Sequence, residues 1–140
     1  RLVEQTGVEV WVEGLNEFHI KGGVLVHNHH LAADWVRRID HPQLRLAFDC
    51  YHQQRDSGNL IWGLEEYFGL YPTVHIGDVP TRQEPGTGEI NYRNVFAHIH
   101  GKGFTGIVGM EHGKAHGGLE GEQQPLLTRG ERSPPIRERL

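Results

Sequence analysis

Short apolar runs alternate along the chain with segments whose apolar residues fall at helical spacing. Four strand-like runs are predicted at residues 8–12, 44–48, 73–78 and 106–110. Three helical patterns are predicted at residues 31–39, 60–68 and 92–100. Strands that alternate with helices in this way favour an α/β fold, in which a parallel sheet is covered by helices.

Two architectures fit this alternation: an open doubly wound sheet and part of a closed (β/α)8 TIM barrel. A whole barrel takes about 250 residues, so four βα units in 140 residues correspond to half of one. No glycine-rich phosphate-binding fingerprint follows the first strand, which argues against a dinucleotide-binding fold. We therefore predict a partial (β/α)8 barrel in residues 1–113. Residues 114–140 lack sustained periodicity, and we predict an irregular, disordered tail there.

Composition narrows the class of protein. No run approaches the roughly 18 apolar residues of a membrane span, and the single cysteine excludes a disulfide scaffold. The formal net charge of −4 lacks the basic footprint of a nucleic-acid-binding protein. No secretory leader is visible, so we predict a cytoplasmic protein. Because the sequence begins at Arg1 and its only methionine is Met110, we expect it to be a piece of a longer one.

Each predicted strand ends in a side chain that can bind a metal or move a proton. These residues are Glu13, Asp49, His75 and Glu111. A polar residue at one strand end is common, but in a parallel barrel all four would meet at one face. Three carboxylates and one imidazole form a hard, oxygen-rich ligand set. We therefore predict a divalent metal site for Mg²⁺ or Mn²⁺, with Co²⁺ or Zn²⁺ as alternatives.

Two further residues lie close to these strand ends in the sequence. His52 follows Asp49 by three residues, and Arg82 lies a few residues after His75. An arginine here can clamp a substrate carboxylate or hydroxyl, and His52 can touch a ligand in the mouth of the barrel. The alternative for both is a solvated loop residue.

Several other residues that could carry chemistry are interpreted as structural. The histidine-rich segment 27–30 reads as a loop with a surface histidine cluster, because adjacent residues cannot all face one ion. Trp11, Trp35 and Trp62 fall within strand or helix patterns and are predicted to be core residues. Cys50 is predicted to be a buried structural thiol.

Two segments carry a resemblance to a known family. They are LAFDCYHQQ at residues 46–54 and VHIGDVPTRQEPGTGEINY at residues 74–92. Together they resemble the hydroxypyruvate isomerase branch of the xylose-isomerase-like TIM-barrel superfamily, which also holds ketose 3-epimerases. The resemblance runs from about residue 4 to 113 and implies that the chain corresponds to strands five to eight of the barrel.

The resemblance implies roles for the strand-end residues. Glu13 and Glu111 match two glutamates that bind the metal and exchange protons with substrate. Asp49 and His75 match the other two metal positions. His75 resembles the epimerase version more closely, because some hydroxypyruvate isomerases carry glutamine there.

The resemblance also implies two substrate contacts, and the sequence departs from the family pattern at one position. His52 matches a substrate-contacting histidine, and Arg82 lies near the substrate arginine of the family, whose register differs between branches. The proline that often follows the fifth-strand glutamate is Gly14 here.

The function implied is an isomerase for a small hydroxy-carbonyl substrate, with hydroxypyruvate and tartronate semialdehyde as the leading pair. Proton transfer would run through an enediolate whose charge a metal stabilises. The alternatives are a ketose 3-epimerase and an inactive truncated fragment. A metal-dependent abasic-site endonuclease is disfavoured by the negative net charge and by the need for more histidine ligands. We expect no nucleic-acid or membrane partner, and self-association is left open.

Overall fold

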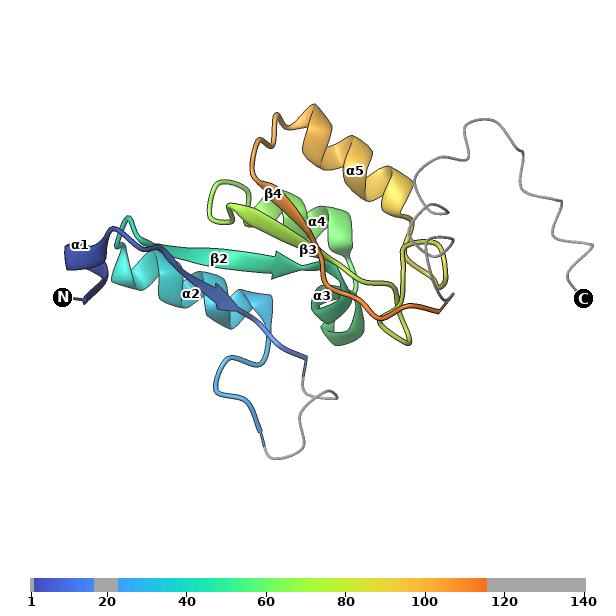
Figure 1. Cartoon of the computed structure of the whole chain (residues 1–140), viewed down its shortest axis with the longest axis horizontal. Coiled ribbons are helices and arrows are strands. Elements are labelled where there is room, and N and C mark those ends of the chain that lie inside the picture. The colour runs from blue at the N-terminus through green and yellow to red at the C-terminus, as the bar shows by residue number, and fades with distance from the viewer. Residues whose placement is uncertain (1, 17–22, 116–140) are drawn as a thin grey trace, which may run out of the picture.

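A computed structural model of the chain describes residues 2–16 and 23–115. Its centre is a four-stranded sheet in the order β1-β2-β3-β4, and every neighbouring pair is parallel. The strands are β1 (Val10–Glu13), β2 (Leu44–Asp49), β3 (Thr73–Ile76) and β4 (Ile107–Met110). In Figure 1 they run from the blue β1 to the orange β4. This confirms the α/β class and the parallel sheet predicted from the sequence.

A short helix precedes β1, and the other helices connect the strands and cover one face of the sheet. The helices are α1 (Leu2–Thr6), α2 (His29–Ile39), α3 (Cys50–Asp56), α4 (Leu60–Glu66) and α5 (Tyr92–Gly101). The side chain of Asn91 caps α5 by accepting the N–H of Asn94. Among the described residues, no helix is long and apolar enough to cross a membrane.

The core lies between the sheet and the helices. Alternate strand residues point toward the helices, and Leu46, Phe48, Val74 and Ile76 are each fully buried there. Helix α2 contributes small side chains to the same cluster, including Ala33. Because side chains alternate across a strand, the intervening residues face the opposite side of the sheet. That opposite side carries the strand-end groups.

The structure adds one helix and corrects two local expectations. Residues 50–56 form α3, which no predicted pattern covered, because the side chain of Asp49 accepts the N–H of His52 and caps the helix directly at the end of β2. Trp62 is 54% exposed and Trp11 is 38% exposed, so neither is a core residue. Cys50 is buried, as predicted. Residues 116–140 lie outside the described part, so the disordered tail stays a prediction.

Candidate metal centre and active site

The four side chains predicted at the strand ends converge at one point. Glu13, Asp49, His75 and Glu111 each offer one ligand atom, and these atoms all lie within 4.8 Å of one another. The strands that carry them are parallel, so their carboxyl ends share one edge of the sheet. The structure thus brings together residues that are up to 98 positions apart in the chain. Their roles in binding and catalysis stay predictions.

Two atoms of this cluster are buried without a hydrogen-bond partner, namely Glu13 Oε1 and His75 Nδ1. His75 Nδ1 lies 2.6 Å from Glu111 Oε2, but without the orientation of a hydrogen bond. Buried polar atoms normally find a partner. Lone pairs that approach one another without a hydrogen bond suit a shared cation. The donor set of three carboxylates and one imidazole therefore fits a hard divalent metal ion.

Burial and mutual repulsion oppose full ionisation of the acids in this cluster. Desolvation, followed by repulsion from Asp49 and Glu111, raises the pKa of Glu13 to about 8. Desolvation also raises the pKa of Asp49, against the opposing attraction of Arg82. Both shifts favour the neutral carboxylic acid. A bound cation would favour the ionised forms instead.

Arg82 enters the cluster from the loop after β3. Its Nη2 lies 2.8 Å from Asp49 Oδ2 and 3.2 Å from Glu111 Oε1. Its Cζ lies 4.8 Å from the ring centroid of Tyr51. The Arg82 backbone has φ of 55°, a left-handed conformation that costs an L-residue about 1–2 kcal/mol. The structure therefore places the Arg82 guanidinium among the carboxylates of the cluster. The sequence indicated only that Arg82 lies near a strand end.

His52 lies in α3 with one edge of its ring toward the cluster. Its Nδ1 accepts the backbone N–H of Asn16 at 3.0 Å, so Nε2 is the nitrogen that faces the cluster. Nε2 lies 2.8 Å from Arg82 Nη1 and 3.7 Å from Glu13 Oε1. Asn16 is fully buried. Sequence reasoning did not find it, because no local pattern links residues 36 positions apart.

His29 supports the site from behind and corrects one sequence-based interpretation. The segment 27–30 was expected to be a surface loop, but His29 begins α2 and is 1% exposed. Its Nε2 accepts the backbone N–H of Asp49 at 2.9 Å. Burial lowers the pKa of His29 to about 3, so the ring stays neutral and remains an acceptor at physiological pH. His29 therefore helps to fix the backbone of a candidate ligand.

A buried carboxylate organises the loop that carries the arginine. Asp78 Oδ1 accepts the backbone N–H groups of Val79 and Ile90 at 2.9 and 3.0 Å. Its Oδ2 accepts those of Gly86 and Gly88 at 2.8 and 3.0 Å. The side chain is 1% exposed. The glycine-rich segment is thus wrapped around one carboxylate rather than around a phosphate group.

At Gly14, directly after Glu13 at the end of β1, the backbone lies very close to the segment that begins α2. A Cβ at this position would overlap the carbonyl group of Asn28 and the backbone nitrogen of His29. A proline, which the family resemblance would favour, carries such a carbon and does not fit this arrangement of the backbone. The close approach connects the end of β1 to the start of α2.

Gly14→Ala is therefore expected to lower the free energy of unfolding by about 1–3 kcal/mol, the usual cost of overpacking. Urea unfolding followed by circular dichroism measures the change. Gly101→Ala is the matched control, because a Cβ at this last residue of α5 meets nothing within 4 Å. Equal stability of Gly14→Ala and the wild type would contradict the close approach.

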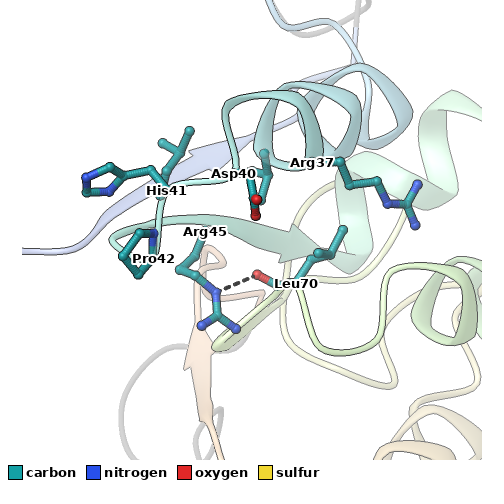
Figure 2. A pocket seen from close by; sticks show the side chains of 8 residues that line it. Arg37, Asp40, His41, Pro42, Arg45 and Leu70 are labelled. Carbon is teal, nitrogen blue, oxygen red and sulfur yellow. Dashed lines mark hydrogen bonds between the residues drawn. The ribbon is translucent and has the colours of Figure 1, made fainter.

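A separate cavity of about 370 Å³ lies away from this cluster. It is lined by Val36, Arg37, Asp40, His41, Pro42, Leu44, Arg45 and Leu70. Figure 2 shows Arg45 reaching the carbonyl oxygen of Leu70, a hydrogen bond of 3.1 Å. Leu44 and Arg45 begin β2 whereas Asp49 ends it. The cavity therefore opens at the opposite end of the strand and is no part of the candidate metal centre.

Four parallel strands with polar side chains at their carboxyl ends are typical of half a (β/α)8 barrel enzyme. The comparison with known families agrees with this class. The family model of the xylose isomerase-like TIM barrel matches residues 1–130. The chain belongs to this family. The resemblance inferred from the two sequence segments is thereby confirmed.

Particular relatives are isomerases by name. A 2-oxo-tetronate isomerase of Pectobacterium atrosepticum is 31% identical over 126 residues, covering 88% of this chain and 47% of the relative. The hydroxypyruvate isomerase of Escherichia coli is 34% identical over 101 residues, covering 72% and 39%. The chain thus spans less than half the length of these relatives.

A solved structure described as an AP endonuclease of family 2 from Brucella melitensis shares the fold. It superposes with a TM-score of 0.80 at 32% identity, and the match covers 87% of this chain and 47% of that chain. The half-barrel organisation predicted from the sequence agrees with this partial coverage.

Proposed function

We propose that the site isomerises a small hydroxy-carbonyl acid by metal-assisted proton transfer. The observation that carries the proposal is the convergence of three carboxylates and one imidazole from four parallel strands within 4.8 Å. Hydroxypyruvate is the leading substrate and tartronate semialdehyde its product. The isomerase names of the relatives support this reaction class.

The residues of the cluster would hold one divalent cation, with Mg²⁺ or Mn²⁺ favoured by the oxygen-rich set. Three carboxylates face one guanidinium, Arg82, in the cluster. A divalent cation would offset the remaining negative charge. When bound, it would supply stabilisation of the negative charge that develops on the substrate oxygens during enolisation.

Two glutamates on different strands would move the protons. Glu13 ends β1 and Glu111 follows β4, so they approach the cluster from the two outer strands of the sheet. One carboxylate removes the proton next to the substrate carbonyl, and the other returns a proton to the adjacent carbon. The handedness of the substrate decides which glutamate acts first.

The environment of His52 and Arg82 favours an acidic substrate. Because His52 Nδ1 accepts a backbone N–H, its ring carries the proton on Nε2. Nε2 then faces Arg82 Nη1, a second donor, at 2.8 Å. An acceptor oxygen shared by these two donors would satisfy both. The carboxylate of hydroxypyruvate provides such an oxygen, so we assign both residues to substrate binding.

A ketose 3-epimerase is the second candidate. In that reaction one of Glu13 and Glu111 would remove the proton from one face of a substrate carbon, and the other would return a proton to the opposite face of the same carbon. Proton exchange in deuterated water separates the two reactions. Isomerisation places deuterium on the carbon that originally carried the carbonyl and moves the carbonyl to the neighbouring carbon. Epimerisation inverts one carbon and leaves the carbonyl in place.

The test is a calorimetric titration of Mn²⁺ into the purified chain. We expect one-to-one binding that is lost or strongly weakened in Glu111→Gln, because the amide removes one anionic ligand. Glu89→Gln is the matched control, since Glu89 is exposed and its side chain contacts Gln54 rather than the cluster. Absence of binding to the wild type, or equal binding by Glu111→Gln, would contradict the proposed centre.

The same titration has an expected pH dependence. Glu13 has a pKa raised to about 8, so below that pH it must release a proton before it binds the cation. Affinity for Mn²⁺ should therefore rise from pH 6 to pH 8 and level off above it. Titrations in two buffers of different ionisation enthalpy measure the released proton. Affinity that falls over this range would contradict the assignment of Glu13 as a ligand.

A further inference from the structure

Arg82 contacts two of the four candidate metal ligands with a single nitrogen. Its Nη2 lies 2.8 Å from Asp49 Oδ2 and 3.2 Å from Glu111 Oε1. The side chain of Asp49 is fully buried, and that of Arg82 is 16% exposed. Because water screens buried charges poorly, these contacts are stronger than an ion pair at the surface. A cation that belongs to the chain itself thus contacts the carboxylates that would bind a metal ion.

The other oxygen of each of these carboxylates also has a neighbour. Asp49 Oδ1 accepts the backbone N–H of His52 at 2.9 Å, and Glu111 Oε2 lies 2.6 Å from His75 Nδ1. Asp49 Oδ2 is therefore the oxygen that holds no backbone N–H, and it is the one that Arg82 contacts. A divalent cation bound to Oδ2 would lie within a few ångströms of the guanidinium, and the two positive charges would repel each other.

The stem and backbone of Arg82 are held by groups other than these carboxylates. Its Nε–H donates to the backbone carbonyl of Glu111 at 3.1 Å, and its Cζ lies 4.8 Å from the ring centroid of Tyr51. The backbone N–H of Arg82 donates to the carbonyl of Asp78 at 2.8 Å, and its carbonyl accepts the N–H of Gly113 at 2.7 Å. The Nη2 end can therefore leave Asp49 while the rest of the arginine stays at the site.

We propose that Arg82 competes with the divalent cation for Asp49 and Glu111, and that metal binding releases its Nη2 for an acidic substrate. Nη1 already faces His52 Nε2 at 2.8 Å, where the substrate carboxylate is assigned. With Nη2 released, the guanidinium can hold that carboxylate through both nitrogens. The inference rests on the proposed metal centre and deepens it, because the metal then binds first and the acid second.

The first measurement is a calorimetric titration of Mn²⁺ into Arg82→Met, whose side chain keeps an unbranched stem but carries no charge. We expect binding about tenfold tighter than in the wild type, within the range usual for two coupled ligands. Arg45→Met is the matched control and should keep the wild-type affinity. It loses the same charge, but Arg45 lies at the opposite end of β2 from Asp49 and donates to the carbonyls of Gly69 and Leu70. Equal or weaker binding by Arg82→Met would overturn the proposal.

Arg82→Lys separates the effect of the charge from the effect of changing the side chain. Lysine keeps the positive charge, so the affinity of this variant for Mn²⁺ should stay close to that of the wild type and below that of Arg82→Met. Far-ultraviolet circular dichroism shows whether each variant is folded. Binding by Arg82→Lys as tight as by Arg82→Met would mean that the charge does not compete with the metal, and the proposal would fail.

The unchanged chain provides a measurement that needs no variant. Acetate serves as the probe for the carboxylate of a substrate, and sodium chloride at equal ionic strength is the control for screening. Because coupling between two ligands is reciprocal, acetate should raise the affinity of the wild type for Mn²⁺ by drawing Arg82 away from Asp49. An unchanged or lower affinity, after correction for Mn²⁺ bound by free acetate, would overturn the proposal. An equal rise in Arg82→Met would also do so, because that variant has no guanidinium for acetate to bind.

Failure of this proposal and failure of the metal centre give different results. If the wild type binds one Mn²⁺ and Arg82→Met binds it no more tightly, the competition is wrong and the centre remains. If neither chain binds Mn²⁺, both the centre and the competition are wrong.

Discussion

Glu111→Gln is expected to lower the rate of isomerisation by about 10²–10⁴-fold, the usual contribution of a positioned acid or base. The amide keeps the size of the side chain but cannot accept or return a proton at the substrate carbon. Formation of tartronate semialdehyde from hydroxypyruvate, followed by proton magnetic resonance in deuterated water, measures both turnover and exchange. Exchange at the substrate carbon should be lost together with turnover.

A weaker metal site could produce the same loss, so two comparisons separate these causes. Each variant is assayed at a concentration of Mn²⁺ that saturates it, as determined by calorimetry. Glu89→Gln makes the same chemical change at an exposed position outside the cluster and should keep the wild-type rate. Full turnover by metal-saturated Glu111→Gln, or no turnover by the wild-type chain, would contradict the proposed mechanism.

Asp78→Ala is expected to lower the free energy of unfolding by about 3–5 kcal/mol. The four backbone N–H groups that its carboxylate accepts would lose their partner, and each buried unsatisfied donor costs about 1–3 kcal/mol before the loop relaxes. The loop also carries Arg82, whose N–H donates to the carbonyl of Asp78. We therefore expect the midpoint of urea unfolding to fall well below that of the wild type.

Asp78→Asn refines this prediction. The amide oxygen can serve one pair of N–H groups, but the amide nitrogen would face the other pair as a donor. The loss of stability should therefore remain substantial. Asp56→Ala is the control, because Asp56 is an exposed aspartate at the end of α3. An unfolding midpoint for Asp78→Ala equal to that of this control would show that the carboxylate does not hold the loop.

The local sequence was sufficient to predict the candidate ligands at the strand ends. Asp49 and Glu111 each follow a short apolar run, and parallel strands bring their carboxyl ends to one edge whatever the intervening loops do. The prediction of four parallel strands thus already implied that these acids meet. The N-cap at Asn91 is likewise a local feature, because its side chain accepts the N–H of a residue three positions away.

The tertiary structure alone decided the surroundings of these ligands. His29 was expected at the surface, yet it is buried against the backbone of Asp49. Asn16 reaches His52 across 36 positions of sequence. Neither contact leaves a local signal, because each depends on how two separate βα units pack.

The sequence by itself determined the class of fold, the family and the four groups that can hold a cation, since these follow from periodicity and from residues near strand ends. Only the tertiary structure decided that Trp62 is exposed and that Arg82 contacts Asp49. It also decided that burial raises the pKa of Glu13. The physical reason is that exposure, ion pairing and desolvation depend on distances between segments, and a linear pattern specifies only the order of those segments.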